Sequence, residues 1–198
     1  MSAPWLIQVN HLTCGPIQNL SFAWPSGVSW ICGDEGRGKT TLLRLLSGDV
    51  RPTAGQVVAP ADGVFWVDLQ DATHDDITVQ ACWDALRARY PHWNQDLLQD
   101  LAEELDMTQH LDKRLNMLSA GSRRKVMVVA ALASGATVTL LDQPFAALDL
   151  GSVRIIHEFL QEAAEHPSRA WIVAAYEAPN DLPLASMLNL DAPDNSQI

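Results

Sequence analysis

A glycine-rich stretch in the first quarter of the chain has the residue types and spacing of a phosphate-binding loop. It fits the pattern GxxxxGKT and consists of Gly33, Asp34, Glu35, Gly36, Arg37, Gly38, Lys39, Thr40 and Thr41. Glycines let consecutive backbone N–H groups turn toward an anion, the lysine reaches the β- and γ-phosphates, and the threonine hydroxyl completes the coordination of Mg²⁺. The stretch therefore predicts a site for a nucleoside polyphosphate with Mg²⁺.

The segments on either side of this loop have the character that such a site requires. Residues 28–32 predict a buried strand, and residues 41–46 predict a helix that ends at Gly48. A helix N-terminus adds its own N–H groups and the positive end of its dipole to an anion site. The order of strand, loop and helix supports the nucleotide site over a chance match in a glycine-containing turn.

Two later segments carry further candidate groups. Residues 138–142 predict an apolar strand that ends in Asp142, where a carboxylate could position Mg²⁺ beside the loop rather than merely terminate the strand. Ser119 precedes a helix predicted over residues 123–133, and Gly121 would allow close approach of an anion to the helix N-terminus. Taken alone, Ser119 is equally well explained as an ordinary helix cap.

Composition narrows the class of partner and the cellular setting. The net charge of −11 argues against nucleic acid as a partner, because phosphate backbones are bound by clustered Lys and Arg. Cys14, Cys32 and Cys82 are widely separated, which indicates reduced thiols in a cytosolic setting rather than a metal site. The start of the chain lacks a signal-peptide pattern, and polar residues interrupt the longest apolar stretch, residues 126–141. We therefore expect no membrane span.

Hydrophobic patterns outline a single α/β domain over residues 1–198. Short predicted strands near residues 5–9, 20–24 and 56–58 suggest a small antiparallel sheet beside a parallel nucleotide-binding core, and a stronger strand is predicted over residues 64–69. Helical periodicity then takes over, and Pro91 must break it. We expect a core from residues 1–71 and 118–198 and a helical insertion at residues 72–117. Within the insertion, the aromatic residues Trp83, Tyr90 and Trp93 could form a docking surface, although helical core is the better interpretation.

In this order the motifs resemble the ATP-binding cassette family, the nucleotide-binding subunits that power membrane transporters. The loop resembles Walker A, and residues 51–55 resemble the turn that follows the first helix. Gln70 resembles the Q-loop glutamine, and residues 118–122 resemble the LSGGQ signature. Residues 138–142 resemble Walker B, and residues 146–149, which end in Asp149, resemble the D-loop.

The resemblance implies a P-loop NTPase fold with a RecA-like core, an antiparallel β-subdomain and a helical subdomain. It implies ATP held between two head-to-tail cassettes, in a homodimer or a heterodimer, docked on a transmembrane permease at the cytoplasmic face of the membrane. Mg²⁺ would be positioned by Thr40, Gln70 and Asp142. Ser119 and Gly121 would act on the nucleotide held by the partner cassette.

The chain departs from the family where hydrolysis takes place. Gln143 stands where the family has a glutamate that acts on the attacking water, and Tyr176 stands where it has the H-loop histidine. Ser122 ends the signature in place of glutamine, and the loop at residues 14–16 lacks the aromatic residue that stacks on adenine. These differences predict a protein that binds ATP and hydrolyses it slowly.

Two alternatives remain open at this stage. The chain could be a non-hydrolysing regulatory subunit that completes a composite ATP site with a competent cassette, or a P-loop kinase of a small molecule with the helical insertion as its lid. Within the family, the LSAG signature and the run at residues 142–145 are most similar to the ATPase of the bacterial haem exporter of cytochrome c maturation. Importers carry the same run, so the transported molecule stays open.

Overall fold

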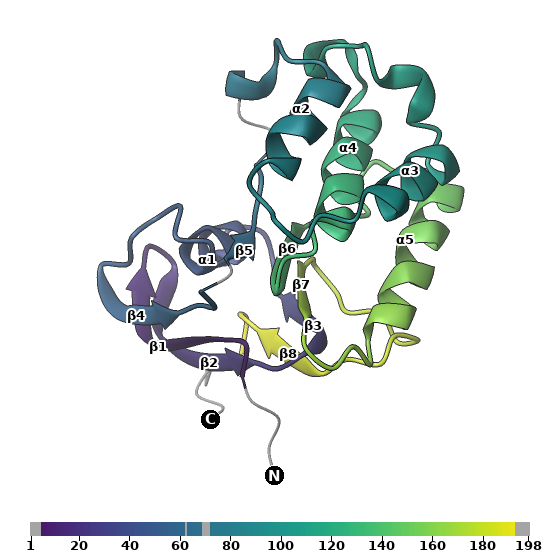
Figure 1. Ribbon diagram of the computed structural model, residues 1–198. Coiled ribbons are helices and arrows are strands. Elements are labelled where there is room, and N and C mark those ends of the chain that lie inside the picture. The colour runs from purple at the N-terminus through teal and green to yellow at the C-terminus, as the bar shows by residue number, and fades with distance from the viewer. Residues whose placement is uncertain (1–4, 62, 69–71, 193–198) are drawn as a thin grey trace. The chain divides into compact units, whose positions relative to one another are not determined.

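The computed structural model describes residues 5–61, 63–68 and 72–192 of the chain (Figure 1). The strands are β1 (Ile7–Cys14), β2 (Ile17–Trp24), β3 (Gly27–Cys32), β4 (Ala54–Val58), β5 (Val64–Phe65), β6 (Val138–Asp142), β7 (Ala170–Ala174) and β8 (Ser186–Asn189). The helices are α1 (Lys39–Leu46), α2 (Val79–Arg87), α3 (Gln95–Glu104), α4 (Ala120–Ala133) and α5 (Leu150–Ala163), with 3₁₀ turns at Ala72–His74, Thr108–His110 and Leu115–Met117. The described residues form two compact units. The first consists of residues 5–61, 63–66, 137–143 and 159–192, and the second of residues 67–68, 72–136 and 144–158.

The first unit contains the small antiparallel sheet that the sequence predicted, and its strand order is β2-β1-β4. Ile7, Val9 and Leu12 of β1 are buried and the residues between them are partly or fully exposed, with an irregularity in the pairing between Val9 and Leu12. Gly55 is required where β4 meets β1. Its φ is +81°, and a Cβ on it would lie 2.3 Å from the carbonyl oxygen of His11.

The second sheet of this unit is entirely parallel, in the order β5-β6-β7-β3-β8. Every residue of β3 is buried, as expected for a central strand covered on both faces. The strand expected over residues 64–69 is shorter than predicted: only Val64 and Phe65 pair with β6. The reason is that the chain leaves the sheet after Trp66 and enters the second unit.

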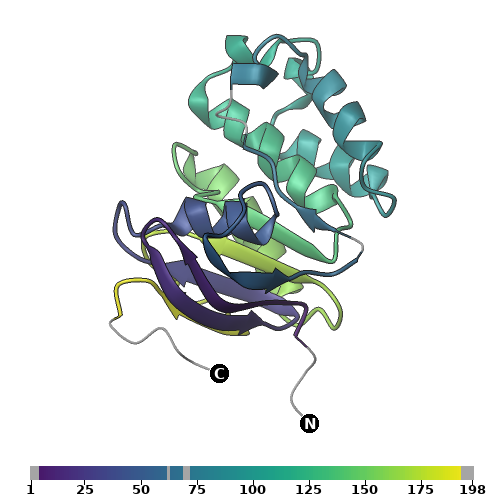
Figure 2. The ribbon, with the colours of Figure 1, turned by 90° about the vertical axis from the view of Figure 1, so that its left-hand side faces the viewer.

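The core of the first unit is built around α1. Four leucines of this helix, Leu42, Leu43, Leu45 and Leu46, are each at most 1% exposed. They belong to one apolar cluster with side chains from both sheets, and α1 contacts β1, β6 and β7 (Figure 2). Burying a leucine side chain contributes about 1.5–3 kcal/mol, so this packing fixes the base of the loop that precedes α1.

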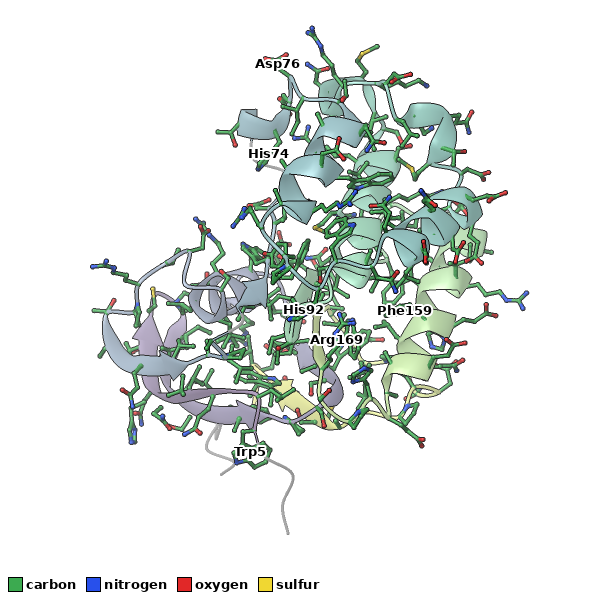
Figure 3. The ribbon with its side chains drawn as sticks, in the orientation of Figure 1. Trp5, His74, Asp76, His92, Phe159 and Arg169 are labelled. Atoms are coloured by element: carbon green, nitrogen blue, oxygen red, sulfur yellow. The ribbon has the colours of Figure 1, made fainter. Side chains whose placement is uncertain are left out.

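An aromatic and cationic cluster lies at the N-terminal end of β7. The indole of Trp171 is nearly fully buried and packs edge-on against the rings of Phe159 and His166. The guanidinium carbon of Arg169 lies 4.6 Å from the centroid of the Trp171 ring, and Figure 3 labels Arg169 and Phe159 in this region. Burial lowers the pKa of Arg169, and it lowers the pKa of His166, with Arg169 as the second cause.

The second unit is a helical layer in which α4 lies between α2 and α3 (Figure 1). Residues 126–133 of α4 are all buried, as expected of a helix that is covered all round. The indole N–H of Trp83 donates to the carbonyl of Val126 at 3.0 Å. Trp83 and Tyr90 are 2% and 7% exposed, so for these two residues the core interpretation is confirmed.

Candidate functional site

The topology of the parallel sheet brings three predicted site segments to one edge. Strands β6, β7 and β3 are neighbours and run in the same direction. Asp142 ends β6, Tyr176 follows β7, and the glycine-rich loop follows β3. In open α/β sheets, ligands bind beyond the carboxyl ends of the strands, so these segments lie where a ligand site is expected.

Backbone geometry explains two of the loop glycines in different ways. Gly36 has a φ of +77° with open space around its Cβ position, so conformation alone favours glycine there. Gly38 has a φ of +98°, and a Cβ on it would lie 2.8 Å from Pro16 and 2.9 Å from Ile17. Gly38 therefore lets the hairpin between β1 and β2 pack closely against the N-terminus of α1.

Lys39 is a buried cation that is hydrogen-bonded to the backbone of the loop. Its side chain is 6% exposed, and its ammonium donates to the carbonyl oxygens of Gly33 at 2.5 Å and Asp34 at 2.9 Å. The ring of Tyr176 lies 4.5 Å from the ammonium, measured to the ring centroid. The resemblance suggested that Tyr176 takes the place of a histidine at the γ-phosphate, and the observed contact adds a cation–π interaction with Lys39.

The hydroxyl of Thr40, in the first turn of α1, is hydrogen-bonded to the carboxylate of Asp142, at the end of β6. Oγ1 of Thr40 donates to Oδ2 of Asp142 at 2.5 Å. These hard oxygen donors fit Mg²⁺, which is bound by one or two protein ligands together with phosphate oxygens and water. Among the described residues there is no cluster of three or more His, Cys, Asp or Glu that could hold a metal by itself.

Gln143 has an unusual backbone conformation directly beyond Asp142. Its φ is +45°, and its N–H donates to the carbonyl of Ala174 at 2.8 Å, which joins the ends of β6 and β7. Non-glycine residues occupy this left-handed region uncommonly, and such conformations concentrate at functional sites. The amide side chain can orient water but cannot accept its proton.

A second group of predicted residues lies in the helical unit. Ser119 caps α4 by accepting a hydrogen bond from the N–H of Ser122 at 3.1 Å. A Cβ on Gly121 would lie 2.5 Å from the carbonyl oxygen of Ala147, so glycine is required for local packing. Ala147 itself has a φ of +60°. The first turn of α4 and the segment 144–149 are therefore packed as one piece.

Asp149, the last residue of the segment 144–149, makes hydrogen bonds with Ser152 and an ion pair with Lys125. Its carboxylate accepts from the N–H of Ser152 at 2.9 Å and from the Ser152 hydroxyl at 2.7 Å, and it lies 3.1 Å from Nζ of Lys125. These hydrogen bonds from Ser152, followed by the contact with Lys125, hold the pKa of Asp149 well below its usual range. The adjacent Arg124 donates to the carbonyl of Ala146.

The candidate residues thus fall into two groups. The loop, Asp142, Gln143 and Tyr176 belong to the first unit, and the helix cap and Asp149 belong to the second. Gln70 lies outside the described residues. Sequence reasoning missed Asp191, whose carboxylate contacts two residues of the loop, because an acidic residue after a short strand carries no motif.

Burial sets the reactivity of two of the three cysteine thiols. All three are free, and Cys32 and Cys82 are buried. Burial raises the pKa of Cys32, and it raises the pKa of Cys82 to about 11. Both thiols are therefore poor nucleophiles at neutral pH.

Comparison with known proteins identifies the family. The family model described as ABC transporter matches residues 17–146. The chain belongs to the ABC transporter family. The resemblance to ATP-binding cassettes is thereby confirmed, and the kinase alternative is left without support.

Named relatives of this ABC chain include proteins of two sizes. It is 32% identical over 166 residues to the cytochrome c biogenesis ATP-binding export protein CcmA of Escherichia coli, a match that covers 78% of this chain and 77% of that protein. It is 35% identical over 123 residues to CcmA of Gluconobacter oxydans, covering 62% and 56%. It is 31% identical over 160 residues to the ABC transporter ATP-binding/permease protein Rv1747 of Mycobacterium tuberculosis, covering 72% of this chain but only 18% of that larger protein.

Solved ABC structures share the fold. An ATP-binding subunit of an ABC transporter superposes with a TM-score of 0.69 at 18% identity, covering 85% of this chain and 79% of that one. A nucleotide-free ATP-binding cassette superposes with a TM-score of 0.65 at 16% identity, covering 88% and 82%. The P-loop NTPase fold with a parallel sheet, an antiparallel sheet and helices is therefore confirmed.

Proposed function

We propose that this ABC chain binds Mg-ATP at the edge formed by the glycine-rich loop and Asp142, and couples that binding to a membrane partner. The single observation that carries the proposal is the hydrogen bond between Thr40 and Asp142, which joins the start of α1, where Lys39 is bound to the loop carbonyls, to the carboxyl end of β6. A cation, a hydroxyl and a carboxylate in this arrangement match the needs of a polyphosphate with its metal.

The proposed roles combine the contacts of the loop residues with what the family resemblance implies for the others. Lys39 exchanges its carbonyl partners for β- and γ-phosphate oxygens, and the N–H groups at the start of α1 face the same anion. Thr40 and Asp142 hold the metal, with Gln70 proposed as a further ligand. Bound Mg²⁺ would supply positive charge that offsets the negative charge of the phosphate oxygens. Ser119, Gly121 and Asp149 are proposed to act across a dimer of two cassettes.

We propose that turnover is slow. Gln143 directly follows Asp142, and its backbone N–H is bonded to the carbonyl of Ala174. Without a carboxylate at this position, the attacking water lacks a general base, whose contribution to rate is typically about 10² to 10⁴. The Tyr176 ring, which packs on Lys39, replaces an imidazole.

The same residues favour a second candidate function. Both catalytic positions, 143 and 176, carry replacements, as expected of a subunit that binds ATP without hydrolysing it and completes a composite site with a competent cassette. A single-turnover ATPase assay separates the two candidates. Measurable phosphate release by a homodimer supports the slow ATPase, and its absence supports the partner subunit.

The partner is proposed to be a transmembrane permease. Among the described residues, no helix is both long enough and apolar enough to cross a membrane. The relatives named CcmA are ATP-binding export proteins of cytochrome c biogenesis, and we propose an export partner of that kind for this chain. Peripheral attachment at the cytoplasmic face of the membrane follows from such a partner.

Calorimetry with Mg-ATP tests the nucleotide site. Lys39→Ala removes the buried cation of the loop and should abolish most of the affinity, because charge-assisted bonds to phosphate are lost. Lys113→Ala is the matched control, since it removes the same charge from an exposed position in the helical unit. Equal affinities of Lys39→Ala and the wild type would refute the proposed site.

A further inference from the structure

The segment after β8 places a carboxylate against the phosphate loop. Oδ2 of Asp191 accepts a hydrogen bond from the backbone N–H of Asp34 at 3.0 Å. Its other oxygen, Oδ1, lies 2.7 Å from Nε of Arg37. One side chain therefore contacts two residues of the loop between Gly33 and Gly38.

Asp191 is itself held in place. Its backbone N–H donates to Oδ1 of Asn189 at 2.9 Å, and the N–H of Leu190 donates to the carbonyl of Cys32 at 2.9 Å. Leu190 also packs beside Gly33, where its Cβ lies 3.2 Å from the position that a Cβ on Gly33 would take. The pairing of β8 with β3 thus continues to the base of the loop, and the Asp191 carboxylate is carried on a paired backbone.

The backbone of Gly33 and Asp34, the first arm of the loop, is hydrogen-bonded by side chains from two different segments. Lys39 binds the carbonyl oxygens of Gly33 and Asp34, and Asp191 binds the N–H of Asp34. The side chains of Arg37 and Asp191 are 54% and 32% exposed, so water screens their ion pair. The hydrogen bond from the Asp34 N–H acts on the backbone of the loop itself, whereas the ion pair acts on the Arg37 side chain.

We propose that Asp191 is a positioning residue for nucleotide binding. Its carboxylate keeps the first arm of the loop in the shape that receives phosphates before any nucleotide arrives. Fixing a backbone segment in advance removes an entropy cost that would otherwise be subtracted from the binding free energy. This inference rests on the proposed function, because it assigns Asp191 to the same ATP site.

Calorimetric titration with Mg-ATP tests the inference. Asp191→Ala should raise the Kd about tenfold, the size expected for one hydrogen bond to a charged group. Asp191→Asn keeps an oxygen acceptor for the Asp34 N–H and should bind within about threefold of the wild type. Asp49→Ala is the matched control, because it removes a similar ion pair, Arg44 Nε to Asp49 Oδ2 at 3.0 Å, beyond the other end of α1. Its Kd should not change.

A double-mutant cycle separates the two contacts of Asp191. In an Arg37→Ala background, Asp191→Ala should still weaken binding by most of the tenfold effect, because the hydrogen bond to Asp34 is still lost. The inference is overturned if Asp191→Ala has no effect in that background, or if Asp191→Asn binds as weakly as Asp191→Ala. Wild-type affinity in Asp191→Ala would overturn this inference alone. A wild-type protein that does not bind Mg-ATP would instead refute the proposed function.

Discussion

In the proposed site, a glutamine at position 143 keeps the shape of a glutamate side chain but lacks the charge that could accept a proton from water. The structure adds that its backbone is fixed, since its N–H is bonded to Ala174 and its φ is +45°. A substitution at this position therefore tests chemistry with little rearrangement of the main chain. Tyr176 differs, because its ring already contacts Lys39 and a new residue there also alters the surroundings of that cation.

Restoring a carboxylate should speed hydrolysis. We expect Gln143→Glu to raise the rate of phosphate release by about 10² to 10⁴, equivalent to about 3 to 5 kcal/mol of barrier, because a general base is regained. The measurement is phosphate release under single-turnover conditions. The double variant Gln143→Glu with Tyr176→His should exceed either single change. If the wild type turns over as fast as Gln143→Glu, position 143 is not that of the base and the proposal of slow turnover is wrong.

Residue types could be read from the sequence where the chemistry is local. The loop was identifiable because its glycines, lysine and threonine are adjacent, and Asp142 because it ends an apolar strand. Asp191 and Tyr176 contact the loop through strand pairing that only the fold creates. No sequence pattern therefore indicated that the Asp191 carboxylate binds the Asp34 N–H, or that the Tyr176 ring packs on the Lys39 ammonium.

At the scale of elements, the start of α4 and the segment before α5 behave as one packed piece. Gly121 and Ala147 are in direct apposition, and two basic side chains of α4, Arg124 and Lys125, hold Ala146 and Asp149. The resemblance offered a different reason for Gly121, an approach to the partner's nucleotide. A loss of function on changing Gly121 would not by itself support that role, because local packing is disturbed as well.

A methyl group at position 121 should destabilise this piece. Gly121→Ala would force the Ala147 carbonyl to move, and overpacking of this kind typically costs about 1–3 kcal/mol of the free energy of unfolding. Urea unfolding measures it. Gly151→Ala is the control, since a Cβ there meets only the end of the Asp149 side chain, at 3.3 Å. Equal destabilisation by both variants would contradict the packing argument.

The turn before β7 should make stability depend on pH. Nδ1 of His166 accepts from the N–H groups of Ser168 at 3.3 Å and Arg169 at 3.1 Å, which favours the neutral ring. Burial, followed by the charge of Arg169, lowers the His166 pKa. The unfolded chain therefore binds more protons below its pKa of about 6.5. The contribution of neutral His166 to the free energy of unfolding is fully present above pH 6.5, the approximate unfolded-state pKa, and is lost as pH falls through the lower folded-state pKa.

Comparison with His166→Asn isolates this effect. The asparagine oxygen can accept the same N–H groups but does not titrate, so the variant should lose less stability than the wild type between pH 7.5 and 5.5. Urea unfolding at the two pH values gives the difference. His110, whose pKa is also lowered, chiefly by burial, contributes equally to both proteins. Parallel losses in the two proteins would remove His166 as a source of the dependence.

For the whole molecule, the fold class was predictable from the sequence, whereas the two compact units reflect contacts between segments distant in the chain. Short apolar segments around the loop predicted a small antiparallel sheet beside a parallel core, and the structure has both, with β3 of the parallel sheet fully buried. The second unit takes in α4 and residues 144–158, which the sequence grouped with the core. Contacts such as Trp83 with Val126 define that unit, and no local pattern reports them.

ATP-driven dimerisation tests the proposed assembly of two cassettes. Ser119 caps α4, so a variant must preserve the cap if the test is to report on the nucleotide of the partner. Asp and Asn are both good N-cap residues, and each can accept from the N–H of Ser122. Ser119→Asp adds a negative charge that would face the partner's phosphates, whereas Ser119→Asn is its neutral control.

Both variants should keep the wild-type free energy of unfolding and Mg-ATP affinity as monomers. In size-exclusion chromatography with Mg-ATP, Ser119→Asn should still dimerise and Ser119→Asp should not, because like charges at a closed interface repel. Dimerisation of both variants would show that Ser119 does not face the nucleotide of a second cassette.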